Sequence, residues 1–263
     1  MAGKILNFFK FIWEYFKISI QTAMEYRMNF FSQAGLMFMN NIIFLVFWII
    51  LIGKFNTINA WGVKDIMLLN AIISLSWGLC GSFFGNFQGI AEAIRDGQLD
   101  FYLALPKEEL THLLVSKSKF SSFGDVAFGI VLSAIFISWT QVPLFILCII
   151  CSVILILSFA ITLGSISFYL GSSVELSNQG MMGMLGVSSY PIDIFSGYTK
   201  FILLTIIPAG LISGVPVNLL KQFNIQSFFW LIGVTTIFLV FSIILFKKGI
   251  KRYESGNLIN VRM

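Results

Sequence analysis

The stretch MNFFSQAGLMFMNNIIFLVFWIILIG, residues 28–53, contains no charged residue and decides the fold. At about 1.5 Å of rise per residue, a helix over this range is longer than the roughly 30 Å of hydrocarbon in a bilayer. Further uncharged runs cover residues 66–91, 126–174, 201–220 and 222–246. A chain with this pattern is predicted to be an integral membrane protein that crosses the bilayer several times.

The composition agrees with this prediction and leaves room for one domain. Hydrophobic residues make up 57% of the chain and charged residues 11%, and the mean hydropathy is +0.90, whereas a soluble domain is about 25% charged. Because no hydrophilic block is long enough to fold separately, residues 1–263 are predicted to form a single membrane domain. The net charge of +5 raises a nucleic-acid partner as an alternative. The Lys and Arg residues border the apolar runs, however, which favours a role in membrane orientation and no nucleic-acid partner.

An all-α architecture with six spans follows from the breaks between the apolar runs. Thr140-Gln141-Val142-Pro143 divides the longest run, and Gly171 is expected to end the helix after it. Ser172 and Glu175 have the spacing of a capping box at the start of a fifth helix, which is broken at Tyr190-Pro191. The predicted spans are 28–53, 66–90, 126–139, 144–171, 175–197 and 227–246.

Residues 4–21 are predicted to form an amphipathic helix that lies in the membrane interface. One helical face is polar and the rest is rich in aromatic residues. A first spanning helix is the alternative, but the charged groups in its middle would be costly in hydrocarbon. The polar positions are Lys4, Asn7, Lys10, Glu14, Lys17 and Gln21.

Residues 200–220 are predicted to be a re-entrant or broken segment between the last two spans. Tyr190 and Pro191 mark the break before it, and Pro208, Gly210 and Pro216 interrupt it. If the segment does not cross, most of the 17 Lys and Arg residues fall on one side of the membrane together with both termini. Only Lys54, Lys64, Lys200 and Lys221 then fall outside, so the positive-inside rule predicts cytoplasmic termini.

The sequence shows no catalytic, cofactor or metal motif. It lacks a Walker loop, an HExxH motif and a Gly-x-Ser-x-Gly elbow. Asp96 and Asp100 are spaced like the acids of a metal-dependent lipid enzyme, and the alternative is an ordinary solvated loop. An ion-coupled secondary carrier is a further alternative, but Asp125, Glu175 and Asp193 all fall near predicted helix ends rather than at mid-membrane.

Gly81, Gly85 and Gly89 recur every four residues and predict a helical face of small residues. Such a face lets two helix backbones approach closely. Two interpretations remain open, namely packing within the chain and contact with a second subunit.

Residues 91–119 are predicted to be an inner loop that docks a partner. Residues 90–94 continue the preceding helix to an Asp96-Gly97 turn, a short amphipathic segment follows at 99–105, and Pro106 suits the first position of another helix. Exposed aromatic residues on short helices exceed what a plain connection requires. The predicted docking residues are Glu92, Arg95, Asp96, Gly97, Asp100, Tyr102, Leu103 and Pro106.

Four motifs in this order resemble the permease subunits of the ABC type-2 transporter family, over residues 20–250. They are Gly97-x-x-Asp100-x-x-Leu103-x-x-Pro106, Tyr26-Arg27-x-Asn29-Phe30, Tyr190-Pro191-x-x-x-Phe195 and Ile207-Pro208-Ala209-Gly210 with Pro216 after it.

The resemblance implies a dimer of two identical or paralogous permeases, surrounded by membrane lipid, in the bacterial cytoplasmic membrane. Each half would dock through the inner loop on a separate ATPase, two copies per transporter, which binds ATP and Mg²⁺. Such permeases export drugs, peptides, lipids or glycans. Ala104-Leu105 stands where an arginine is common in the family, which puts a charged part of the docking in doubt. A non-transporting membrane or immunity subunit is the remaining alternative.

Overall fold

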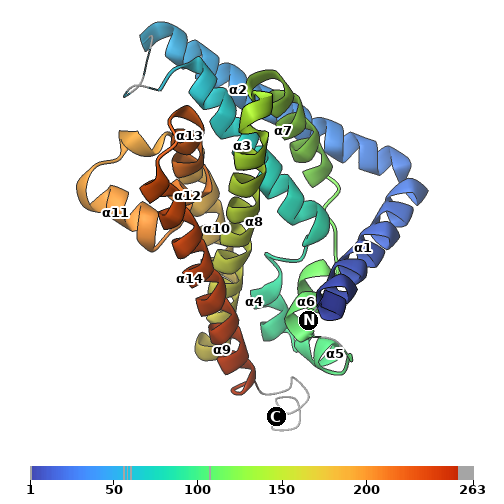
Figure 1. Ribbon diagram of the computed structural model, residues 1–263. Coiled ribbons are helices and arrows are strands. Elements are labelled where there is room, and N and C mark those ends of the chain that lie inside the picture. Colours follow the sequence, from blue (N-terminus) through green and yellow to red (C-terminus); the bar gives the residue numbers. More distant parts are fainter. Residues whose placement is uncertain (1, 56, 58, 60, 107, 254–263) are drawn as a thin grey trace.

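The computed structural model describes residues 2–55, 57, 59, 61–106 and 108–253, with side chains from Lys10 onward except that of Phe55. Its elements are helices throughout this part of the chain (Figure 1). They are α1 (Ala2–Glu25), α2 (Arg27–Phe55), α3 (Val63–Phe83), α4 (Ile90–Arg95), α5 (Leu99–Leu103), α6 (Glu109–Val115), α7 (Ser122–Phe136), η1 (Trp139–Gln141), α8 (Val142–Ser165), α9 (Ser167–Leu170), α10 (Val174–Ser188), η2 (Ile192–Ile194), α11 (Gly197–Thr205), α12 (Ala209–Ile212), α13 (Gly214–Lys221) and α14 (Ile225–Ile250).

The helix α3 lies at the centre of the fold, and glycines let its neighbours approach it closely. A Cβ atom at Gly78 of α3 would lie 2.7 Å from Val126 N of α7, and one at Gly129 of α7 would lie 2.8 Å from Leu75 Cβ of α3. Burial differs sharply between the first two long helices, since 78% of the apolar window of α3 is buried but only 11% of that of α2. The outer surface of α2 is therefore free to face lipid or another chain.

The helix ends define two ends of the bundle (Figure 1). The short helices α4, α5, α6 and α9 lie at one end, called here the loop end, together with the beginning of α1 and the end of α14. The α2–α3 connection and the segment from η2 to α13 lie at the opposite end. The beginning and the end of the described chain therefore lie at the same end of the bundle.

Four helical segments are long and apolar enough to cross a membrane, namely 27–54, 63–83, 139–170 and 225–250. The helix α11 and the segment 209–221 qualify together, with a 66° bend at the break between them. The helices α7 and α10 have 15 residues each. At about 1.5 Å per residue this length falls short of the hydrocarbon thickness, so the prediction of six full spans stays a prediction.

Several predicted helix limits are corrected by the structure. The prediction of a helix over 66–90 is wrong after Phe83, where α3 ends in a turn. The predicted span 126–139 corresponds to α7, which begins four residues earlier, at Ser122. The break after α7 lies at Ile137-Ser138, which are extended, and Pro143 occupies the first turn of α8, where its missing N–H is harmless. The predicted spans 28–53 and 227–246 lie inside longer helices, α2 and α14.

The connection between α9 and α10 agrees with one prediction and contradicts another. Gly171 has φ +77°, a conformation that glycine adopts without strain, and it follows the last residue of α9. The predicted span 144–171 is therefore covered by α8 and α9. Ser172 is not the N-cap of α10, because the residue directly before the helix is Ser173. The hydroxyl of Ser173 contacts Ser167 Oγ at 2.7 Å. The predicted fifth span, 175–197, ends as a helix at Ser188.

The helix α1 includes the predicted amphipathic segment 4–21 and turns sharply into α2 at Tyr26 (Figure 1). Its polar positions from Lys10 to Gln21 are exposed. Part of its aromatic face is covered by protein, since the Phe16 ring lies 4.4 Å from that of Phe83 and the Phe11 ring 4.6 Å from that of His112. Trp13 and Ile18 remain exposed, and the predicted position in the membrane interface stays a prediction.

Candidate functional site: the inner loop and a cleft between the long helices

The predicted inner loop is closed by hydrogen bonds between its two ends. The Asn86 side chain donates to Leu113 O at 3.0 Å, Ser118 Oγ donates to Ser82 O at 2.7 Å, and Lys119 N donates to Gly81 O at 2.9 Å. Lys119 Nζ also contacts Gln88 Oε1. Burial lowers the pKa of Lys119. Residues 84–119 therefore form a closed unit at the end of α3 and α7.

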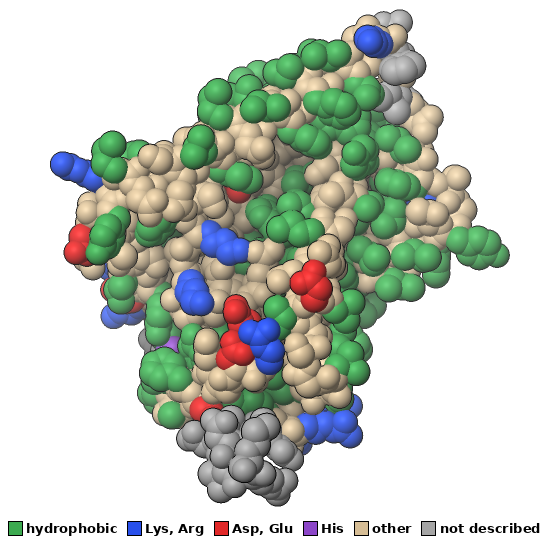
Figure 2. Space-filling model, turned by 180° about the vertical axis from the view of Figure 1, so that it is seen from behind, with side chains coloured by type: hydrophobic (Ala, Val, Ile, Leu, Met, Phe, Trp, Pro, Cys, Tyr) green, Lys and Arg blue, Asp and Glu red, His purple; other side chains and the backbone are tan. Residues whose placement is uncertain are grey.

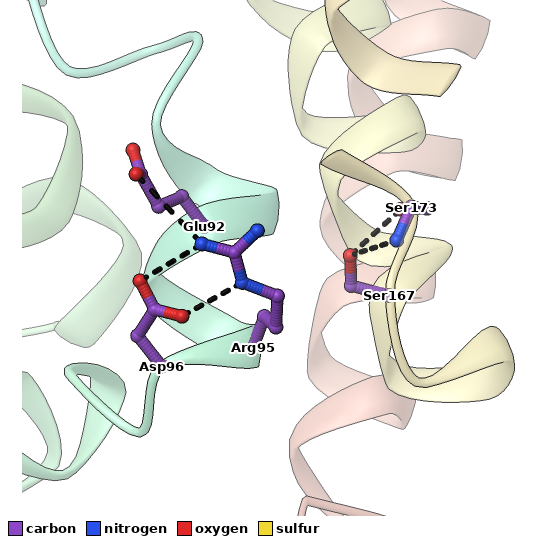
Figure 3. Close-up of polar contacts among 5 residues, drawn as sticks. All are labelled: Glu92, Arg95, Asp96, Ser167 and Ser173. Atoms are coloured by element: carbon purple, nitrogen blue, oxygen red, sulfur yellow. Dashed lines mark hydrogen bonds and ion pairs between the residues drawn. The ribbon is translucent and has the colours of Figure 1, made fainter. Parts of the chain in front are cut away.

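The helix α4 buries one face and exposes a charged one (Figure 3). Arg95 donates from Nε to Asp96 Oδ1 at 2.7 Å and from Nη2 to Asp96 Oδ2 at 3.1 Å, and Nη2 lies 3.9 Å from Glu92 Oε1. The hydrogen bond with Asp96 raises the pKa of Arg95 and lowers that of Asp96. On the buried face, a Cβ atom at Gly164 of α8 would lie 2.6 Å from Ile90 Cβ. Three of the four charged residues predicted for docking therefore lie together, on α4 and at its C-terminal end, and α4 is packed tightly against α8.

The helix α5 presents apolar side chains to the outside. Gly97 has φ +72°, which confirms the predicted turn after Asp96. Leu99 is fully buried and anchors α5, whereas Phe101 is 66% exposed and Leu103 is 41% exposed. Pro106 is exposed too, but its predicted place at the first position of a helix is wrong, because α6 begins at Glu109. Tyr102 is partly buried and packs against the core.

Two other helices hold α5 and α6 in place. His112 of α6 is buried, and its Nδ1 lies 3.2 Å from the hydroxyl of Tyr15 of α1. Lys247 of α14 forms an ion pair with Glu108 Oε1 at 3.0 Å. Burial and, after it, the nearby Asp100 carboxyl raise the pKa of Tyr253 to about 12, which places Asp100 beside the end of α14. The loop is thus connected to α1, α3, α7, α8 and α14.

The predicted glycine stripe does not lie on one helix. Gly81 belongs to α3, but Gly85 and Gly89 follow its end. A Cβ atom at Gly85 would lie 2.6 Å from Lys117 O and 2.7 Å from Ser118 Cα, and one at Gly81 would overlap Ser122. Gly89 faces the side chain of Asn86. Gly81 and Gly85 therefore make close contacts within the chain, between the two ends of the inner loop.

The predicted re-entrant segment is folded around a buried isoleucine at the opposite end. Pro208 directly precedes α12, and a Cβ atom at Gly210 would lie 2.5 Å from Ile192 Cδ1. Pro216 is buried in the first turn of α13. The remaining two predicted residues differ, since Pro191 is buried and Tyr190 is exposed beside Trp48, at 5.5 Å between ring centroids.

Asp193 connects this segment to the α2–α3 connection. Its Oδ2 accepts hydrogen bonds from Trp61 Nε1 at 2.9 Å and from Asn218 at 3.3 Å, and its Oδ1 pairs with Lys200 Nζ at 2.7 Å. Burial acts to raise the pKa of Asp193, but these three hydrogen bonds outweigh it and hold the pKa below its ordinary value. Lys221 adds an ion pair with Asp65 at 2.9 Å. The cluster therefore joins η2, α11 and α13 to the distant α2–α3 connection.

A cleft between α2, α3, α7 and α10 was not predicted from the sequence. It encloses about 350 Å³ and is lined by Met37, Asn40, Asn41, Ile43, Phe44, Phe47, Asn70, Ile73, Ser74, Trp77, Asp125, Leu185 and Ser189. Asp125 is 4% exposed and accepts a hydrogen bond from Asn41 Nδ2 at 2.7 Å. Adjacent asparagines in the middle of an uncharged run were the available signal, because polar groups in hydrocarbon are costly.

The charged and apolar surfaces are separated along the bundle. Figure 2 shows a broad hydrophobic area over the upper part of one face and most of the Lys, Arg, Asp and Glu side chains of that face over the lower half. The lower half corresponds to the loop end in Figure 1. Cys80, Cys148 and Cys151 are buried and form no disulfide. Within the described residues no group of His, Cys, Asp and Glu is arranged to hold a metal ion.

Comparison with known proteins gives one match. A sequence model of the family described as ABC-2 family transporter protein matches residues 38–256, from the middle of α2 to just beyond the described chain. None of the curated proteins and none of the solved structures compared with the chain matches it. The family match covers α3 to α14 completely and includes the inner loop, the cleft and the opposite end.

Proposed function

Because this chain belongs to the ABC-2 transporter family, we propose that it is the permease subunit of an ATP-driven exporter in a bacterial cytoplasmic membrane. Separate ABC ATPase subunits, two copies per transporter, bind and hydrolyse ATP with Mg²⁺. A second copy of this permease or a paralogue completes the translocation path. The substrate is an amphipathic drug-, peptide- or lipid-like molecule.

The proposal is carried mainly by the construction of the inner loop. Phe101, Leu103 and Pro106 are exposed next to the charged group of α4, so an apolar contact with a polar rim is available to a partner protein. The loop is also fastened to α8 through Ile90 and to α14 through Glu108. A partner that moves α5 therefore displaces long helices rather than a loose connection.

The arrangement of the helices supports six spans with both termini in the cytoplasm. The start of α1 and the end of α14 lie at the loop end, where the ATPase would dock (Figure 1). The helices α7 and α10 are shorter than the hydrocarbon layer is thick. They would cross it together with the residues that flank them, or where the bilayer is thinned around the protein. The helix α1 would lie along the cytoplasmic interface, with Trp13 and Ile18 toward the lipid.

The exposed side of α2 supports a second subunit or lipid as its neighbour. Leu36, Met39, Ile43, Phe47 and Ile50 are all more than two-fifths exposed along this helix. Such a continuous apolar surface on one helix is suited to a hydrophobic neighbour.

The docking role is tested with the cognate ABC ATPase, whose gene we expect beside the gene of this chain. The two are purified together in lipid nanodiscs, and their ATPase activity is compared with that of the ATPase alone. Phe101→Ala should lower the affinity of the ATPase for the permease about tenfold or more, because exposed aromatic residues often dominate an interface. Trp139→Ala is the matched control, since Trp139 is 93% exposed but lies outside the loop. Equal affinities of the two variants would contradict the proposal.

The alternatives give different results in the same preparation. A secondary carrier would transport in response to a proton gradient when ATP is absent. A non-transporting membrane or immunity subunit would not change the hydrolysis rate of any ATPase that it binds.

A further inference from the structure

Two polar residues of the cleft lie at the middle of a long apolar helix, α2. Asn40 and Asn41 are midway between Arg27 and Lys54, the charged residues that bound the apolar segment of α2. Asn70 and Ser74 line the cleft from α3, and Asp125 lines it from α7. A volume of about 350 Å³ is within the usual range of small-molecule sites. Polar side chains at this depth are costly and are usually retained for function.

Asp125 is the unusual member of this group. Its side chain is more than nine-tenths buried. Among the described side chains, Asn41 donates a hydrogen bond to it, from Nδ2 to Oδ1 at 2.7 Å. None of the ion pairs among the described residues includes Asp125. The second carboxyl oxygen, Oδ2, is therefore left to whatever occupies the cleft.

Three other polar side chains of the cleft each donate a hydrogen bond inside the protein. Asn70 Nδ2 donates to Ile66 O at 2.9 Å, and Ser189 Oγ donates to Leu185 O at 3.0 Å. Asn41 uses its amide on Asp125. These three side chains keep oxygen atoms with free acceptor capacity. The cleft consequently offers several acceptor oxygens beside an acid that pairs with no Lys or Arg among the described residues.

Three aromatic rings contribute to the apolar part of the lining, beside Met37, Ile43, Ile73 and Leu185. Phe44, Phe47 and Trp77 lie on the same cleft as Asp125, from the neighbouring helices α2 and α3. Aromatic faces accept both apolar chains and cations. An occupant that matches all these groups has an apolar body and a cationic head that donates hydrogen bonds.

We propose that the cleft binds amphipathic amines, with a primary or secondary ammonium group at Asp125 and the acceptor oxygens and the apolar body along the aromatic rings. The inference rests on the proposed function, because it names the substrate class of the exporter. An ammonium group has several N–H donors, whereas a quaternary ammonium has the same charge and none. The site should therefore bind the primary or secondary ammonium more tightly than the quaternary ammonium. A negative potential without hydrogen-bond acceptors would bind both equally.

The experiment measures binding to the full-length chain in phosphatidylcholine nanodiscs, by equilibrium dialysis against empty nanodiscs. The three probes are dodecylamine, dodecyltrimethylammonium and dodecanol, which share one apolar chain. The wild-type protein should bind dodecylamine about tenfold or more tightly than either of the others, since charge-assisted hydrogen bonds are strong. Asp125→Asn should remove that preference. Glu175→Gln, which removes an exposed acid on α10 outside the cleft, should keep it.

The outcomes separate this inference from a structural role of Asp125. Equal binding of the three probes by the wild-type protein would overturn the inference, and so would a preference that persists in Asp125→Asn. If Asp125→Asn does not fold, the comparison of the probes on the wild-type protein still decides. Binding needs no ATPase, so the two proposals fail separately. An amine preference without ATPase stimulation would refute the exporter, and stimulation without an amine preference would refute the site.

Discussion

The loop end and the opposite end of the bundle are both made of broken helices, but they use their charged groups differently. At the loop end, Arg95 pairs with Asp96, its neighbour in the sequence, and the pair is exposed. At the opposite end, Asp193 is bonded to Trp61 and Asn218, which come from other segments of the chain. The local pair of Arg95 with Asp96 remains on the surface, where a partner of the loop can reach it, although Glu108 of the same loop pairs with Lys247 of α14. Long-range hydrogen bonds instead tie the re-entrant segment to the α2–α3 connection.

The largest effect in this comparison is expected for Gly85→Ala at the loop end. A Cβ atom there meets backbone atoms of Lys117 and Ser118, which cannot turn away as a side chain does. We expect the variant to be destabilised by about 2–3 kcal/mol, as in other overpacked sites. The measurement is the thermal unfolding midpoint in detergent.

Gly233→Ala in α14 is the matched control, because a Cβ atom there has no neighbour within 4 Å. It should be neutral or slightly stabilising, since alanine favours a helix over glycine. Unfolding midpoints that fall equally in both variants would show that the ends of the inner loop are not packed as described.

A smaller effect is expected for Asp193→Ala at the opposite end. The change leaves Trp61, Lys200 and Asn218 without their shared acceptor, and the cluster is partly exposed, so we expect a loss of about 1–2 kcal/mol. Hydrogen exchange should increase in residues 192–205 and around Trp61 but not in α4 to α6. Faster exchange confined to the loop end would contradict the separation of the two ends.

The same cluster gives a pH dependence with a defined sign. The pKa of Asp193 is lowered in the folded protein, so its contribution to stability is complete above the unfolded value of about 3.9 and is lost as the pH falls through the folded value. We therefore expect protection of residues 192–205 to be constant near neutral pH and to fall below about pH 4. In Asp193→Ala this acid-dependent step should be absent, and its persistence there would assign it to another group.

The smallest effect is expected for Lys247→Ala, which removes the ion pair with Glu108. Both side chains are more than half exposed, and such pairs contribute little, so the loss of stability should be below about 0.5 kcal/mol and should vanish in high salt. Lys248→Ala is the control, since Lys248 forms no ion pair within the described residues. A loss above about 1 kcal/mol for Lys247→Ala alone would show that α14 anchors the loop more strongly than exposure suggests.

The sequence predicts those parts of the fold that depend on local patterns. The uncharged run at 28–53 correctly predicted a helix, and Gly171 correctly predicted the turn after α9. Pro208 correctly predicted the break before α12. The end of α3 at Phe83 was missed, because no proline marks it and the turn at Gly85 depends on contact with Lys117. Ser173 replaces Ser172 before α10 because it contacts Ser167. Local patterns do not contain such contacts.

Of the two candidate sites, the inner loop could be predicted from local sequence, but the cleft could not. Exposed apolar residues on short helices were predicted from the composition of residues 91–119, and the structure exposes Phe101 and Leu103 there. The hydrogen bond of Asn41 with Asp125 joins residues 84 positions apart, so only packing reveals it. The sequence placed Asp125 near a helix end rather than at mid-membrane. It does lie in the first turn of α7, but it is buried against α2.

The most direct test of the account is a cross-linking experiment on the two ends of the bundle. Phe101→Cys at the loop end and Tyr198→Cys at the opposite end are both made at highly exposed aromatic positions, and the natural cysteines are buried. With the proposed ABC ATPase partner produced in the same intact cells, a thiol-reactive photocross-linker should join Phe101→Cys to the ATPase and leave Tyr198→Cys unlinked. A cross-link at Tyr198→Cys, or none at Phe101→Cys in an assembled complex, would contradict docking at the inner loop.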